Sequence, residues 1–107
     1  MSKYLVQANY SSDGVKGILK EGGSSRRAAV EKLFESVGSK IEAFYYAFGD
    51  TDLFIIVDGS DNVTAASLSL TVNAVGAVAA KVTVLLTPEE IDAATRISPL
   101  YRPPGQS

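Results

Sequence analysis

The sequence contains no cysteine, no histidine and no tryptophan. Without cysteine the chain cannot form disulfide bonds, thiolate nucleophiles or sulfur-ligated zinc sites. Without histidine it lacks the side chain that most often serves as a general base and as a transition-metal ligand. We therefore expect neither a bound metal nor a cofactor, and any catalysis would have to use other residue types.

The sequence also has no large excess of positive or negative charge and no long apolar run. The 107 residues carry a net charge of −2, and no basic stretch extends beyond Arg26-Arg27. A nucleic-acid-binding protein usually presents a basic face, so we expect no nucleic-acid partner. The apolar runs are too short to span a bilayer, and the N-terminus lacks the pattern of a signal peptide. The simplest prediction is a cytoplasmic protein with no membrane partner.

Apolar periodicity predicts the element order β-α-β-β-α-β. A hairpin is expected around Gly49-Asp50-Thr51-Asp52, and that element order is the ferredoxin-like, split βαβ arrangement. We expect an α+β fold in residues 1–96, with one antiparallel sheet, both main helices on one face and a short C-terminal helix, followed by an irregular Pro-rich tail over residues 97–107. The strand-like runs are residues 4–10, 41–48, 53–57 and 80–86.

Capping residues and glycines predict where the helices begin and end. Asp13 is a candidate cap for a short helix that Gly22-Gly23 interrupts. Ser24 or Ser25 can cap the first main helix, and Gly38 can end it. Asp61 or Asn62 can begin the second main helix, and Gly76 can end it. Thr87, Pro88 and Glu90 form a capping box that predicts a terminal helix to about Thr95.

The predicted strands carry apolar residues on both faces of the sheet. Simple alternation places Ile41 and Tyr45 on one face of the second strand and Phe44 and Tyr46 on the other. If the third strand follows the same parity, one face carries Phe44, Tyr46, Phe48, Phe54 and Ile56. The opposite face then carries Tyr45 and Ile55. Two helices cover only one face, so we expect the other face to bind a second copy. The alternative is that loops or the Pro-rich tail cover it, and the sequence does not decide which parity meets the helices.

These residues resemble a known family, the GYD domain. The resemblance runs from about Lys3 to Ala94 and includes Tyr4-Leu5-Val6, the aromatic segment 43–53 and Val57-Asp58. Gly49 and Asp52 match the signature Gly-x-Tyr-Asp, whereas Thr51 stands where the signature has Tyr. The family implies a dimeric α/β barrel and supplies no catalytic residues to transfer.

Two loops are candidate sites. Gly49 and Asp52 belong to a turn in which the carboxylates of Asp50 and Asp52 could bind a cation, although turn chemistry explains both residues. The loop before the first main helix could bind an anion through backbone amides, because two arginines in the first turn oppose the helix dipole. Its candidate residues are Gly23, Ser24, Ser25 and Arg26.

A polar set in otherwise apolar elements is the candidate for a ligand pocket: Gln7, Asn9, Tyr45, Ser69 and Asn73. A solvent-facing location for most of them is the alternative. The leading functional hypothesis is a homodimer that binds a small, partly apolar molecule. A cofactor-independent enzyme, as related barrels allow, and an interaction or assembly module without a ligand are the other two.

Overall fold

The structure, a computed structural model, describes residues 2–59 and 61–106. Its four strands form one antiparallel sheet in the order β2-β3-β1-β4, which agrees with the predicted ferredoxin-like arrangement. The elements are β1 (Ser2–Tyr10), α1 (Ser12–Glu21), α2 (Gly23–Glu35), β2 (Lys40–Tyr46), β3 (Leu53–Gly59), α3 (Asn62–Val75), β4 (Val78–Leu85) and α4 (Pro88–Thr95).

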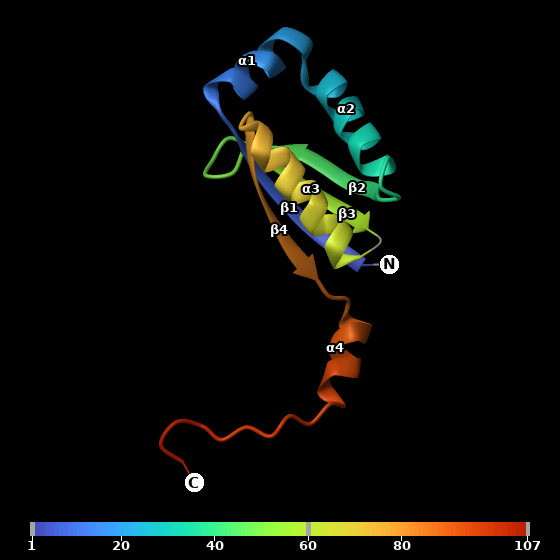
Figure 1. Cartoon of the computed structure of the whole chain (residues 1–107), viewed down its shortest axis with the longest axis vertical. Helices are drawn as coiled ribbons and strands as arrows, with labels where there is room; N and C mark the ends of the chain where they lie inside the picture. Colours follow the sequence, from blue (N-terminus) through green and yellow to red (C-terminus); the bar gives the residue numbers. More distant parts are fainter. Residues whose placement is uncertain (1, 60, 107) are drawn as a thin grey trace.

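Helices α2 and α3 lie on the same face of the sheet, as predicted (Figure 1). Helix α2 packs against β2 and α3 against β4, while β1 and β3 run between these outer strands. Alternate side chains of the central strands point towards the helices and supply most of the core. The buried apolar residues are Tyr4, Val6, Ala8, Val30, Phe34, Phe44, Leu53, Ile55 and Val57.

The structure confirms the predicted caps of α3 and α4. Asp61 caps α3 by accepting a hydrogen bond from the Thr64 amide at 2.7 Å, and Gly76 ends the helix at φ 87°. Such a positive φ is readily adopted by glycine because it has no Cβ. Thr87 and Glu90 form the reciprocal capping box of α4.

The predicted N-terminal caps of α1 and α2 are wrong by two to three residues. Ser11, not Asp13, caps α1, and its own amide bonds to the Ala77 carbonyl at 3.0 Å, which ties the helix start to the sheet. Gly22, rather than Ser24 or Ser25, precedes α2 because its φ of 85° lets one helix end and the next begin without a linker.

Helix α2 also ends earlier than predicted. Its C-cap is Ser36, and Gly38 follows in a turn at φ 74°. The Ser39 amide then reaches back to the Phe34 carbonyl at 2.9 Å, so the glycine serves the turn that leads into β2.

The face of the sheet opposite the helices, which we call the outer face, carries Tyr45, Phe54 and Ile56. The predicted parity of the hairpin was therefore wrong: Phe54 pairs with Tyr45, and Phe44 pairs with Ile55 on the helix side. The cause is that cross-strand register, not position along each strand, decides which residues share a face. A β-bulge between Ile41 and Ala43 adds a second departure from alternation, since it puts Ile41 on the helix side with Phe44.

Beyond β4 the chain leaves the sheet and forms a C-terminal arm, residues 86–106 (Figure 1). The arm lengthens the molecule to 61 Å, against 31 and 23 Å in the other directions. Its apolar side chains Leu86, Ile91, Ile97, Leu100 and Tyr101 are all exposed, so the arm does not cover the outer face of its own chain. Among the described residues, no helix has the length and apolar character needed to cross a bilayer.

Two glycines of α1 provide a matched test of how closely this helix approaches the sheet. A Cβ on Gly14 would overlap the Ala77 carbonyl oxygen, whereas a Cβ on Gly17 would meet no atom. We expect Gly14→Ala to lower the free energy of unfolding by about 1–3 kcal/mol through overpacking. Gly17→Ala should raise it by about 0.5–1 kcal/mol, because alanine favours the helix. Urea denaturation of both variants checks this, and equal effects would contradict the close approach.

Candidate functional site

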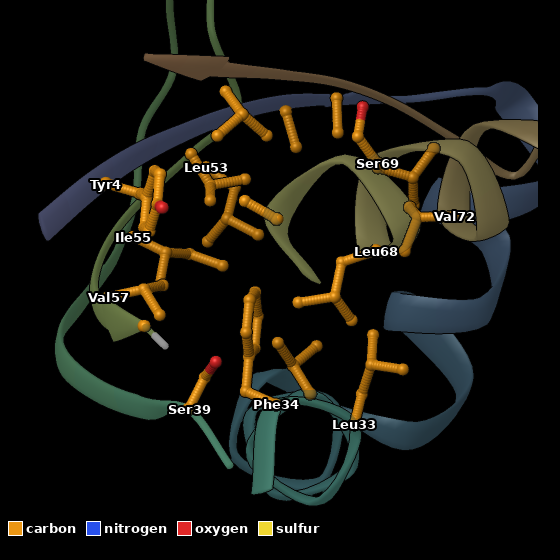
Figure 2. A pocket seen from close by; sticks show the side chains of 18 of the residues that line it. Tyr4, Leu33, Phe34, Ser39, Leu53, Ile55, Val57, Leu68, Ser69 and Val72 are labelled. Carbon is orange, nitrogen blue, oxygen red and sulfur yellow. The ribbon is translucent and has the colours of Figure 1, made fainter. Parts of the chain in front are cut away.

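A cavity of about 70 Å³ lies between the sheet and helices α2 and α3. Its floor is formed by the helix-facing side chains of β1 and β3, and the helices supply its sides (Figure 2). Tyr4, Ile55, Val57, Phe34, Leu68 and Val72 are among the side chains that surround it. The cavity is thus mainly apolar, as small-molecule sites commonly are.

A few polar groups interrupt this apolar wall. Ser39, Asp61 and Ser69 line it, and so do Tyr10 and Arg26. The Asp61 carboxylate is already engaged as the cap of α3. By contrast, the Tyr10 hydroxyl is buried and has no hydrogen-bond partner among the described residues. An unpaired buried donor costs free energy, so this hydroxyl is available to a ligand.

The predicted ligand-pocket residues are not brought together. Ser69 lines the cavity, and the Asn73 side-chain amide lies beside it, donating to the Ser69 carbonyl at 2.8 Å. The same Asn73 side chain accepts a hydrogen bond from the Ala80 amide at 2.7 Å, which fastens α3 to β4. Gln7, Asn9 and Tyr45 lie on the outer face, because Gln7 pairs with Phe54 and Phe54 with Tyr45.

The predicted anion loop meets the cavity at one residue. Arg26, in the first turns of α2, is half-buried and lines the cavity, whereas Ser24 and Ser25 are exposed. The Gly23 carbonyl accepts a hydrogen bond from the Tyr46 hydroxyl at 3.0 Å, so an aromatic residue of β2 supports the loop. No side chain caps the N-terminus of α2, and its first turn has no acidic residue.

Tyr10 and Tyr46 both lie close enough to Arg26 for its charge to affect their pKa values. Burial raises the pKa of the Tyr10 phenol, the neighbouring Tyr46 adds to the rise, and the Arg26 guanidinium opposes it. Burial likewise raises the pKa of Tyr46, again against the influence of Arg26. Both phenols therefore keep their protons at neutral pH and act as hydrogen-bond donors.

The sequence reasoning overlooked Tyr10 as a site residue. Tyr10 shares the parity of Tyr4, Val6 and Ala8 on β1, and that alternation was the available signal. The signal was not decisive because the sequence left open which parity faces the helices. Arg26 was found for a different reason, its place near a helix start.

Asp52 of the signature turn ties the hairpin to the first strand. Its carboxylate accepts a hydrogen bond from the Tyr10 amide at 3.0 Å, just beyond the last β1–β3 pair, Ala8 with Leu53. Its own amide donates to Asn9 Oδ1 at 2.9 Å and to the Ala8 carbonyl at 3.0 Å. Gly49 lies in the exposed part of the loop, where a Cβ would meet no atom. These contacts favour turn chemistry for Asp52 over a cation site.

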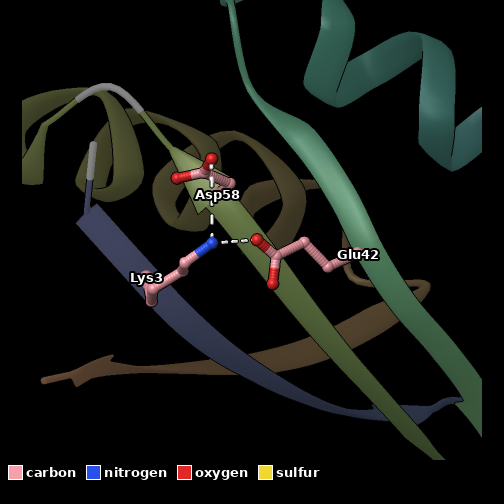
Figure 3. Close-up of polar contacts among 3 residues, drawn as sticks. All are labelled: Lys3, Glu42 and Asp58. Atoms are coloured by element: carbon pink, nitrogen blue, oxygen red, sulfur yellow. Dashed lines mark hydrogen bonds and ion pairs between the residues drawn. The ribbon is translucent and has the colours of Figure 1, made fainter. Parts of the chain in front are cut away.

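A polar cluster lies at the other end of the outer face (Figure 3). Lys3 donates to Glu42 of the bulge and lies 3.7 Å from Asp58, so β1 is linked to β2 across β3. The hydrogen bond to Glu42 raises the pKa of Lys3, and burial opposes the rise. Within residues 2–59 and 61–106, no group of three or more acidic residues is placed to hold a metal ion.

The Asp52 contacts generate a testable prediction. Asp52→Ala leaves the half-buried Tyr10 amide without its acceptor, so the free energy of unfolding should fall by about 1–3 kcal/mol. Asp52→Asn keeps a carbonyl oxygen and should lose less. The control is Asp50→Ala in the same loop, where an exposed side chain should change stability by less than about 0.5 kcal/mol. Chemical denaturation of the three variants is the measurement, and equal losses at both positions would contradict the assigned role.

In the comparison with known protein families, residues 4–95 match the family described as GYD domain. The match includes β1 from Tyr4 onward, the other three strands, helices α1 to α4 and the loop that contains Asp52. Comparison with curated proteins and with solved structures gives no match. Because the family match covers most of the 107 residues, this chain belongs to the GYD domain family.

Proposed function

We propose that this protein is a homodimer that binds a small, partly apolar molecule in the cavity between the sheet and helices α2 and α3. The cavity carries the proposal. Its wall is mostly apolar, yet it contains a buried hydroxyl donor without a partner and a half-buried arginine. That combination suits a ligand with an apolar body and one polar end.

The size of the cavity limits the ligand. Its volume of about 70 Å³ is roughly half that of an engineered apolar cavity, about 150 Å³, that admits benzene. A molecule with about four carbon atoms, or the end of a longer chain, is therefore the appropriate size.

The proposed dimer rests on the outer face. Tyr45 is 71% exposed and Phe54 36% exposed, and both lie beside Ile56 and Leu5 on the same face. Helices α2 and α3 lie on the opposite side of the sheet, and the C-terminal arm extends away from the end of β4 (Figure 1). An exposed aromatic patch of this kind usually marks an interface, and a second copy would bury it by a twofold axis.

Binding can be tested with 1-butanol as the probe. We expect it to shift the NMR methyl signals of Val30, Ile55 and Val57, whose side chains line the cavity. Ala65→Leu puts three more carbon atoms into the cavity wall and should weaken binding at least about tenfold, a loss of about 1.4 kcal/mol. The matched control is Ala66→Leu, because Ala66 is exposed and outside the cavity wall.

The methyl spectra also report folding, so a misfolded Ala65→Leu variant is recognised directly. In that case Ala80→Val, a smaller enlargement of another cavity residue, replaces it. A probe that leaves the cavity methyl signals of the wild-type protein unchanged would refute the binding proposal.

The dimer is tested separately by light scattering. We expect the wild-type protein to have about twice the chain mass of 11.3 kDa. Phe54→Glu puts a charge at the centre of the outer face and should give a monomer, because an unpaired charge is costly to bury. Leu70→Glu is the control, since Leu70 is 73% exposed on α3 and should leave the dimer intact. A monomeric wild-type protein would refute this part of the proposal.

A further inference from the structure

The cavity is electrically asymmetric along β1. Arg26 lies at the Tyr10 end, where it influences the pKa of that phenol. Asp61 lies at the Tyr4 end, next to Asn62, which accepts a hydrogen bond from the Tyr4 hydroxyl at 2.7 Å. The two tyrosines are six positions apart in the strand, a distance of about 20 Å. The positive and negative groups of the wall are therefore well separated.

The two charged groups differ in what they already bind. Asp61 accepts the Thr64 amide as a helix cap. Arg26 belongs to none of the ion pairs among the described residues, whereas its neighbour Arg27 pairs with Glu31 at 3.6 Å. Two carboxylates affect the pKa values of the tyrosines: Glu21 acts on Tyr46, and Asp52 acts on Tyr10. Glu21 is exposed, and the Asp52 carboxylate accepts a hydrogen bond from the Tyr10 amide. The positive charge of Arg26 is thus not paired with a carboxylate among the described residues, although its guanidinium lies close to the Tyr10 phenol.

The neighbours of Arg26 add further donors. The buried Tyr10 hydroxyl is unpaired, and a ligand oxygen would relieve the cost of leaving it so. The N-terminus of α2 lacks both a side-chain cap and an acidic residue in its first turn. The positive end of its helix dipole therefore also favours a negative charge at this end of the cavity.

We infer that the ligand is a short apolar carboxylate, whose carboxylate group is held by Arg26 and the Tyr10 hydroxyl. Its apolar part lies along Val30, Leu53 and the other apolar side chains of the cavity. This inference rests on the proposed binding function and specifies the chemical class of the ligand. A single guanidinium matches the planar geometry of a carboxylate, whereas a phosphate dianion would call for more than one cation.

The test compares butanoate with 1-butanol, two probes of nearly equal size that differ in charge. Dissociation constants come from titrations of the cavity methyl signals of Val30, Ile55 and Val57. Charge-assisted hydrogen bonds should make butanoate bind roughly tenfold to a hundredfold more tightly than 1-butanol. Arg26→Gln should remove this preference without weakening 1-butanol, and Tyr10→Phe should reduce the preference. Arg27→Gln is the matched control and should leave it unchanged.

The outcomes separate this inference from the function on which it rests. Equal binding of the two probes, or a preference that survives Arg26→Gln, overturns the carboxylate assignment while the binding cavity stands. Butanoate shifts confined to surface residues of α2 also overturn it. Tighter binding of propylphosphonate than of butanoate points to a phosphate-like ligand and overturns the carboxylate assignment too.

If neither butanoate nor 1-butanol shifts the cavity methyl signals, the proposed binding function fails, and the inference fails with it. If Arg26→Gln misfolds, Arg26→Lys replaces it and should retain only part of the preference, because lysine lacks the planar fork.

Discussion

The arrangement of two helices over four strands determines the rest of this molecule. Strands about 4.8 Å apart place the two outer strands roughly 14 Å apart, whereas closely packed helices lie about 8–10 Å apart. Because α2 packs against β2 and α3 packs against β4, the distance between the two helices follows the distance between the two outer strands. A space opens above β1 and β3, and no large side chain in the described part of the chain is completely buried.

The sequence keeps that space open. Helix α3 faces it with Ala65 and Ser69, and β1 with Ala8, all of which are too small to reach across. The larger residues Leu68 and Phe34 stand at its sides (Figure 2). A core evolved only for stability would gain from larger side chains at these small positions, since filling a void restores both dispersion and burial energy. This choice of residues is what makes a ligand a better explanation of the cavity than loose packing.

Local signals predicted the fold, and non-local contacts determined the site. The element order, the cap of α3 and the capping box of α4 each depend on a few neighbouring residues, and the structure agrees with them. The grouping of Tyr45 with the cavity failed because it required the register between β2 and β3. Ser69 and Arg26 line the cavity, but nothing local in the sequence connects them, since they come from different helices.

The bulge in β2 shows how strongly the two faces depend on each other. If Glu42 were paired as an ordinary strand residue instead of forming the bulge, Ile41 would move from the core to the outer face. Glu42 also accepts the hydrogen bond from Lys3, which anchors the bulge to β1 across β3 (Figure 3). The cluster of Lys3, Glu42 and Asp58 therefore marks the position in β2 at which the alternation of inward and outward side chains changes. Beyond it, Phe44 completes the core beside the cavity while Tyr45 stays exposed on the outer face, so the proposed binding site and the proposed interface both depend on the register of this one strand.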